Sequence, residues 1–210
     1  AYGALAYILA NSFIRGWTDT PTHTIDRALE LAKTAVHLDP STPQTYWSLG
    51  YVYLMRKDYK KAEKSVANAI KVAPSHSDAY GLQALISNNL VQPEKAIEYA
   101  QKGMRLNPFY TWDYLYNLGR AYYTLNRYEQ AVEMLEQASD RNPNTITVKT
   151  FLAASYAQAG MTEEAEWEID QLLALNPNLT LTQIRQTLPM SDPEHFDKLA
   201  QDLRKAGLPE

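Results

Sequence analysis

Apolar residues recur along the chain at intervals of three and four positions, the spacing that places them on one face of an α-helix. Helices of this kind are expected first at about 1–14 and 24–38, and further ones follow to the end of the chain. Proline closes every second helix, because proline inside a helix costs about 3 kcal/mol. The pattern predicts an all-α protein.

The helical pattern repeats along the chain with a nearly constant period. Each repeat ends in a similar phrase, as in "AVHLDP", "GMRLNP" and "LLALNP", and the closing prolines are 34, 34, 35 and 34 residues apart. Such a period predicts stacked copies of one helix pair, whose apolar faces are buried only when neighbouring copies build a continuous core. The closing prolines are Pro40, Pro74, Pro108, Pro143 and Pro177.

Small and large residues recur at the same positions within different repeats. Gly50 with Ala62, and Gly119 with Ala131, are expected where two antiparallel helices cross closely. The shared positions are Tyr46, Leu49, Gly50, Tyr53, Tyr59, Ala62 and Ala69 in one unit, and Leu115, Leu118, Gly119, Tyr122, Tyr128, Ala131 and Ala138 in another. The unit at 77–110 departs from this frame, for instance at Gly103, and is expected to be the loosest.

These positions resemble the tetratricopeptide repeat (TPR) family, and the match covers about 1–179. The resemblance implies a solenoid, a right-handed superhelix of antiparallel helix pairs, here about five repeats. The chain is interpreted as a single TPR domain, 1–210, with a C-terminal helical cap at 180–210. The repeats are expected at 1–42, 43–76, 77–110, 112–145 and 146–179.

The two ends of the chain depart from the repeat. A long loop follows the first helix; we expect Trp17 to fold back onto the helices and Thr24 to cap the second helix. The last helix is expected to begin at Ser191 or Asp192 and to end before Gly207, and the two helices after Pro177 to cover the open end of the array. Since the sequence starts with Ala inside an apolar segment, we expect a fragment of a longer protein.

Composition excludes several function classes. The net charge of −4 disfavours a dedicated nucleic-acid binder, and the absence of cysteine excludes disulfides and thiolate metal sites. No apolar run approaches the ~20 residues of a membrane span. The four histidines do not cluster with carboxylates, and we find no catalytic constellation, so neither metal, cofactor nor enzymatic activity is expected.

The TPR resemblance implies a concave groove lined by the first helix of each pair. Aromatic and amide side chains dominate the lining, which favours a protein or peptide segment as partner. If the first repeat keeps the frame, it adds Tyr7 and Asn11. The expected groove residues are Trp47, Tyr51, Leu54, Leu85, Asn88, Asn89, Tyr116, Arg120 and Tyr123.

Charge is distributed unevenly along the repeats. Segment 41–75 carries six basic residues against two acidic ones, and 129–170 carries nine acidic residues against two basic ones. Solvated outer faces explain most runs of this kind. The alternative is a homo-oligomer in which the basic and acidic regions of successive copies attract one another.

Two segments resemble a narrower group of proteins. "RGWTDTPTHTIDRALELAKTAVHLDPSTPQTY" and "LPMSDPEHFDKLAQDLRKAGLPE" are similar to parts of the TPR regions that follow class III adenylate/guanylate cyclase domains in bacteria. The resemblance implies a cytoplasmic scaffold or regulatory region of a cyclase-like signalling protein. Related tails also follow DNA-binding regulators, so that parent stays open as an alternative.

Overall fold

The computed structural model describes residues 1–209, which form twelve α-helices and no strand. Short turns join the two helices within most pairs. The helices are α1 (Tyr2–Ile14), α2 (Pro21–Leu38), α3 (Pro43–Met55), α4 (Tyr59–Val72), α5 (Ser77–Asn89), α6 (Pro93–Leu106), α7 (Trp112–Thr124), α8 (Tyr128–Arg141), α9 (Ile146–Ala159), α10 (Thr162–Leu175), α11 (Leu181–Thr187) and α12 (Pro193–Lys205).

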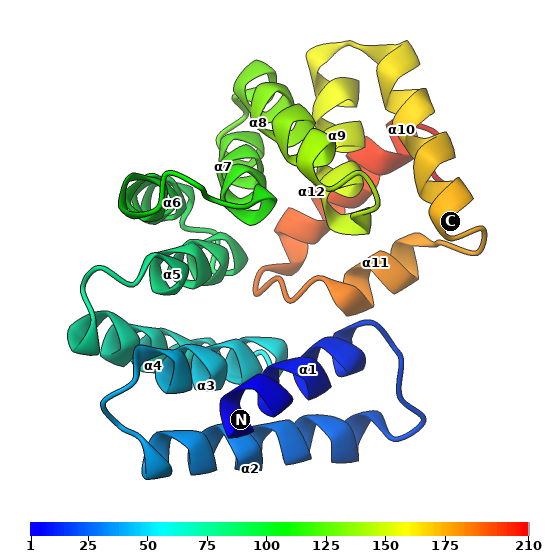
Figure 1. Ribbon diagram of the computed structural model, residues 1–210. Coiled ribbons are helices and arrows are strands. Elements are labelled where there is room, and N and C mark those ends of the chain that lie inside the picture. Colours follow the sequence, from blue (N-terminus) through cyan, green and yellow to red (C-terminus); the bar gives the residue numbers. More distant parts are fainter. Residues whose placement is uncertain (210) are drawn as a thin grey trace.

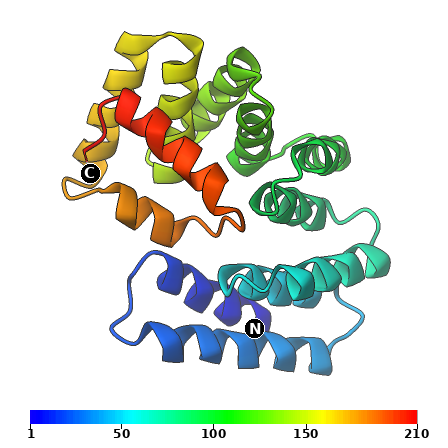
Figure 2. The same ribbon diagram turned by 180° about the vertical axis from the view of Figure 1, so that it is seen from behind.

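The first ten helices pack as five consecutive antiparallel pairs, from α1 with α2 to α9 with α10, and each pair contacts the next. Figures 1 and 2 show the pairs winding along an arc, with α11 and α12 on its inner side. This all-helical solenoid is the architecture that the periodic apolar pattern predicts. The first helices of the pairs form the inner, concave face of the arc.

The expected glycine crossings are confirmed. A Cβ atom at Gly119 would lie 2.5 Å from Leu135 Cγ and 3.2 Å from the carbonyl oxygen of Ala131. At Gly50, a Cβ atom would lie 2.6 Å from Val66 Cγ2. Real Cβ atoms essentially never lie within 3.0 Å of another side-chain atom, so glycine allows α3 to approach α4, and α7 to approach α8, this closely.

The third pair is well packed, contrary to the expected looseness. Its small residues make room for the ring of Tyr114, which α7 inserts between α5 and α6. A Cβ at Gly103 would lie 2.3 Å from Tyr114 Cε1, and one at Gly81 would lie 3.1 Å from Tyr114 Cζ. The departures from the repeat frame are therefore compensated by a large residue of the next repeat.

Two expectations for the first loop are corrected. Helix α2 begins at Pro21, because proline is favoured in the first turn, where its missing N–H is not needed. Thr24 consequently lies inside α2, and its hydroxyl is 2.7 Å from that of Thr18. Trp17 does not fold back onto the helices: it is 71% exposed, with the Arg15 guanidinium 4.9 Å from its ring centre.

The C-terminal segment departs most from expectation. Helix α12 begins as expected, with the Asp192 side chain accepting from the Glu194 N–H, Pro193 in the first turn and Gly207 at φ +100° after the end. However, α12 does not continue the stack beyond α10. It packs on α9, on the inner side of the arc (Figure 2), and Glu210, the last residue of the expected cap, lies outside the described residues.

Candidate protein-binding groove

The nine residues expected to line the groove lie on three first helices, α3, α5 and α7. Their exposure divides them into two groups. Trp47, Tyr51 and Leu85 are partly exposed. The other six are buried, which corrects the expectation of an open groove along the whole face; they are Leu54, Asn88, Asn89, Tyr116, Arg120 and Tyr123.

The buried amides bind neighbouring helices of the same chain. Asn88 Nδ2 donates to the Asn117 carbonyl oxygen at 2.9 Å, and Asn117 Nδ2 donates to the Gly81 carbonyl oxygen at 3.3 Å. Arg120 Nη2 donates to Asn89 Oδ1 at 2.8 Å. These bonds link α5 to α7 within the solenoid, while Asn88 Oδ1 and Arg120 Nη1 have no partner among the described residues.

Helix α12 covers the C-terminal half of the concave face. Its apolar side is almost fully buried, with Phe196 4% exposed and Leu199 and Leu203 0%. These side chains share one core cluster with Tyr123 and Phe151, which come from α7 and α9. The apolar face of α12 is thus bound where a partner segment was expected.

Asp202 is the polar centre of this contact. Its carboxylate accepts hydrogen bonds from the Tyr123 hydroxyl and from Gln158 Nε2, and Lys198 Nζ lies at 3.3 Å. Burial, together with the adjacent carboxylate, raises the pKa of Tyr123, so its hydroxyl stays protonated and donates. Lys205 Nζ adds a bond of 2.7 Å to the carbonyl oxygen of Ala157.

The loop between α11 and α12 reaches further back along the solenoid. The Ser191 N–H donates to the Asn89 carbonyl oxygen at 2.9 Å, at the end of α5. The Tyr59 hydroxyl, at the start of α4, donates to the Pro189 carbonyl oxygen at 2.8 Å. The C-terminal segment therefore connects the fifth repeat to the second and third.

Two buried nitrogen atoms at this contact lack a hydrogen-bond partner among the described residues. The Arg120 guanidinium is 2% exposed, lies 5.1 Å from the Phe151 ring centre, and has no hydrogen-bond partner for Nη1 among the described residues. His195 of α12 also has a buried ring nitrogen, Nε2, without a partner there. Burial, with Arg120 and Lys198 opposing Asp192, lowers the pKa of His195.

The N-terminal part of the concave face remains accessible through an aromatic cluster of Tyr7, Trp47 and Tyr51. The ring centres of Trp47 and Tyr51 are 5.6 Å apart and nearly parallel, and Tyr7 lies 5.3 Å and 4.8 Å from them. Their polar atoms are held within the chain: Trp47 Nε1 donates to the Asp78 carbonyl oxygen at 2.9 Å, and the Tyr51 hydroxyl to Asn11 Oδ1 at 3.1 Å. As whole residues, Tyr7 is 38% exposed and Trp47 and Tyr51 are partly exposed.

The groove residues expected from the sequence do not include the residues of α12 that occupy the face. The available signal was the spacing of Phe196, Leu199 and Leu203, which predicts one apolar helix side that needs a partner. Glu168 belongs to the acidic segment 129–170, for which solvated outer faces were expected, but its carboxylate is buried and lies 3.0 Å from Lys149 Nζ.

Residues 1–209 contain no helix that is both long and apolar enough to cross a membrane. Within the same range, no three His, Cys, Asp or Glu side chains are grouped so that they could hold a metal ion.

Comparison with known proteins agrees with the fold. Family models of the tetratricopeptide repeat match residues 24–71 and 112–145, so the chain contains tetratricopeptide repeats. Together with the helix pairs on both sides of these matches, this defines the molecule as a TPR solenoid.

Individual relatives are distant. Anaphase-promoting complex subunit 3 of Schizosaccharomyces pombe is 23% identical over 158 residues, 74% of this chain and 23% of that protein. The small glutamine-rich tetratricopeptide repeat-containing protein 2 of Mycosarcoma maydis is 28% identical over 102 residues, 49% of this chain and 29% of that protein. The chain therefore spans less than a third of the length of these curated relatives.

Solved structures share the fold across nearly the whole chain. The crystal structure of PilW, a type IV pilus biogenesis factor, superposes with a TM-score of 0.70 at 16% sequence identity, covering 97% of this chain and 88% of PilW. At this identity the likeness concerns the fold alone.

Proposed function

We propose that the chain is a non-catalytic binding module, which holds a segment of another protein on the open, N-terminal part of its concave face. The observation that supports this proposal is the aromatic cluster of Tyr7, Trp47 and Tyr51, which remains partly exposed while α12 covers the other half. Large aromatic side chains are the anchors on which protein interfaces most often depend.

The cluster favours a partner that contributes apolar side chains. Because Trp47 Nε1 and the Tyr51 hydroxyl are already bonded, the rings offer their faces rather than their polar atoms. Polar groups on its border, such as the Gln44–His76 pair at 2.9 Å, can bind the backbone of an extended segment. In this proposal Trp47, Tyr51 and Leu85 contact the partner, whereas Asn89 and Tyr123 hold the C-terminal segment.

Alanine at Trp47 tests the proposal, with alanine at Trp167 as the matched control. Trp167 is 62% exposed on α10, the second helix of the fifth pair, and is far from the cluster in sequence. Partners captured by the wild-type chain are identified, and their affinities are measured by calorimetry. We expect Trp47→Ala to weaken binding by about thirtyfold, the usual loss of about 2 kcal/mol at an interface anchor, and Trp167→Ala to leave it unchanged.

Equal affinity of both variants for the same partner would refute the proposed site. Circular dichroism of Trp47→Ala provides the control for folding, since the indole also stacks on Tyr51. If Trp47→Ala retains its helix content but no longer binds the partner, the partner was bound through the cluster.

A second candidate is head-to-tail self-association through charge. The basic residues of the second repeat, such as Lys60 and Lys64, are exposed on or beside α4, and Glu163, Glu164 and Glu166 are exposed on α10. Attraction between these faces would be screened by salt. This candidate therefore predicts oligomers at low ionic strength that dissociate as salt is added.

The wider context is proposed from the sequence resemblance alone. Segments 15–46 and 188–210 resemble TPR regions of bacterial cyclase-type signalling proteins, which would place the module in the cytoplasm next to a cyclase domain. The TPR tail of a DNA-binding regulator is the alternative parent. The relatives named above include neither a cyclase-type protein nor a DNA-binding regulator. Sequencing the complete gene tests the two proposed parents directly, and a parent with neither a cyclase domain nor a DNA-binding domain would refute both.

A further inference from the structure

Arg120 is a buried cation that has no counter-ion in the described part of the chain. Its side chain lies on α7 beneath the C-terminal segment, is 2% exposed, and takes part in no ion pair there. Nη2 donates to Asn89 Oδ1 at 2.8 Å and the guanidinium lies 5.1 Å from the Phe151 ring centre, but Nη1 is left without an acceptor. A buried charge that is only partly compensated weakens the contact that buries it.

The first turn of α12 lies next to this cation. Helix α12 starts beside the end of α5, where the Ser191 N–H donates to the Asn89 carbonyl oxygen at 2.9 Å, and continues onto α9. Arg120 is bonded to the side chain of the same Asn89. His195 follows Ser191 by four positions, about one helical turn, and is therefore the residue of α12 that approaches Arg120.

A histidine is poorly matched to this position. Its Nε2 is buried and, like Arg120 Nη1, finds no partner among residues 1–209. Burial and the charges of Arg120 and Lys198 lower the pKa of His195, so its cationic form is opposed even though Asp192 acts in the other direction. The Asp192 carboxylate itself accepts the Glu194 N–H at the start of α12. A carboxylate in place of the imidazole could accept a charge-assisted hydrogen bond from the guanidinium, a bond that the histidine does not form.

We propose that this half of the concave face binds an acidic amphipathic helix of another protein, which replaces α12 and places a carboxylate beside Arg120. In this structure α12 is bound there as an internal occupant (Figure 2). The unpaired guanidinium gives the external helix a contact that the internal one lacks. A ligand shifts such an equilibrium only through a difference in affinity of this kind.

Helix α12 shows what else this face requires of an occupant. Apolar side chains three and four positions apart fill it, as Phe196, Leu199 and Leu203 do. Next to the last of them, the Asp202 carboxylate accepts hydrogen bonds from α7 and α9. A partner helix with both features, and with a carboxylate in the place of His195, makes these contacts of α12 and one more. The additional bond has to offset the advantage that α12 has from belonging to the same chain.

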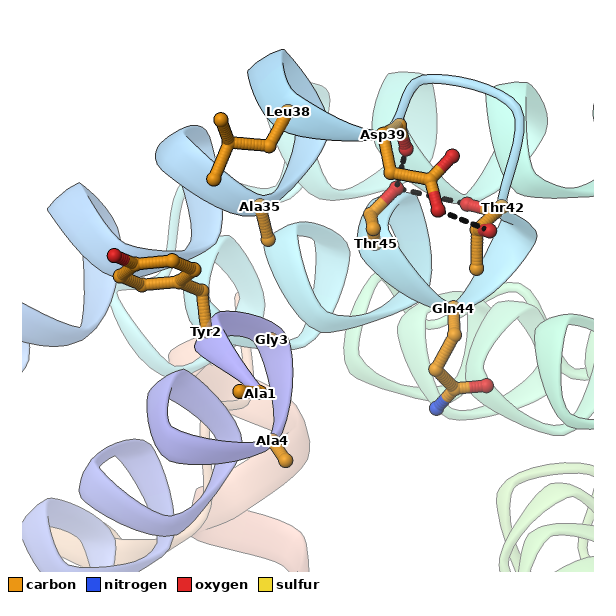
Figure 3. A pocket seen from close by; sticks show the side chains of 10 residues that line it. All are labelled: Ala1, Tyr2, Gly3, Ala4, Ala35, Leu38, Asp39, Thr42, Gln44 and Thr45. Carbon is orange, nitrogen blue, oxygen red and sulfur yellow. Dashed lines mark hydrogen bonds between the residues drawn. The ribbon is translucent and has the colours of Figure 1, made fainter.

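The hollow beside the start of α1 has the opposite charge preference. Its volume is about 320 Å³, and Figure 3 shows Tyr2 and Leu38 beside Asp39, whose carboxylate accepts a hydrogen bond from Thr42 Oγ1. No Lys, Arg or His side chain belongs to its lining, as far as the structure describes it. An acidic helix is repelled there, whereas the face beneath α12 offers it an unpaired cation.

Fluorescence anisotropy with two labelled synthetic peptides tests the charge preference. Both peptides have the sequence of residues 191–209, one with His195→Glu and the other with His195→Gln, so they differ in one charge. The receptor is the full chain carrying Leu199→Glu, whose own α12 can no longer bury its apolar side. We expect the peptide with glutamate to bind at least about tenfold more tightly, and Arg120→Met in the same receptor to abolish the difference.

Competition with α12 is tested with the His195→Glu peptide and three full chains. The wild-type chain and Trp167→Glu, in which an exposed apolar residue of α10 is changed in the same way, should bind at least about tenfold more weakly than Leu199→Glu. Equal binding by all three chains, or binding by none, would overturn the proposal, and so would equal affinity of the two peptides. Trp47→Ala should leave peptide binding unchanged, so the result does not depend on the site proposed at the aromatic cluster.

A measurement within the intact chain keeps the proposal testable if circular dichroism shows that Leu199→Glu loses its helix content. In the full chain at neutral pH, His195→Glu should slow hydrogen exchange of the α12 amides by about tenfold relative to His195→Gln. Arg120→Met should remove this difference. Equal exchange in the two His195 variants would show that a carboxylate at this position does not pair with Arg120, which overturns the proposal.

Discussion

Gly50 and Gly119 lie at the crossings of α3 with α4 and of α7 with α8, where a methyl group has no room. A glycine inside a helix lowers its stability by about 1 kcal/mol relative to alanine, so alanine would improve each helix in isolation. Tertiary packing opposes this gain, because the added atom would overlap the Leu135 side chain at one site and Val66 at the other.

We expect Gly119→Ala to lower the free energy of unfolding by about 1–3 kcal/mol, the usual cost of an overpacked core. Gly3→Ala is the matched control in another first helix. Its added Cβ would lie 3.0 Å from the Ser48 hydroxyl, whereas at Gly119 it would lie 2.5 Å from Leu135 Cγ, so Gly3→Ala should cost clearly less. Urea unfolding of both variants measures the difference; equal stabilities would mean that α7 and α8 can separate without cost.

At the scale of the element, α12 is the helix whose role depends most on its surroundings. Its amphipathic spacing and its Asp192 cap predict that it forms. Where it docks is decided by the apolar face that α7 and α9 leave uncovered, and by Tyr123 and Gln158, which bind Asp202. Such partners are distant in sequence, and no local pattern identifies them.

Acid is expected to loosen α12 through His195. Because burial and the Arg120 and Lys198 charges lower its pKa in the folded protein, the unfolded chain binds this proton more readily. Stabilisation from the neutral histidine is thus fully present above the ordinary value of 6.5 and is lost as the pH falls below it. Hydrogen exchange of α12 amides, corrected for intrinsic rates and compared with α4, should accelerate in this range.

His195→Gln provides the control for this pH dependence, since glutamine keeps a polar side chain that does not titrate. The acceleration in α12 should then disappear. An unchanged pH dependence in the variant would show that another group is responsible.

At the scale of the whole molecule, the C-terminal segment changes how the solenoid is connected. In a simple repeat array each unit contacts only its neighbours, and unfolding can begin at either end. Here the bonds of Tyr59 with Pro189 and of Asn89 with Ser191 connect the last part of the chain to the second and third repeats. Contacts of such long range favour unfolding as one unit.

We therefore expect a single unfolding transition throughout the molecule. Two variants, each retaining either Trp47 or Trp167 as its only tryptophan, should give the same urea midpoint by fluorescence. Adding Asp202→Ala leaves Tyr123 and Gln158 without their acceptor, at a cost of about 1–3 kcal/mol, and should lower the Trp167 midpoint more than that of Trp47. Separate midpoints in the parent chain would contradict this coupling.

The sequence by itself determined the helices, their pairing and the glycine crossings, because these depend on apolar spacing and small residues that recur within each repeat. Its assignment of Trp47 and Tyr51 to a binding groove stays a prediction. Only the tertiary structure decided that Asn89, Arg120 and Tyr123 are buried, and that Trp17 is exposed. The reason is physical: every apolar face must be covered, but which element covers it depends on contacts between residues far apart in the chain, as between Tyr123 and Asp202.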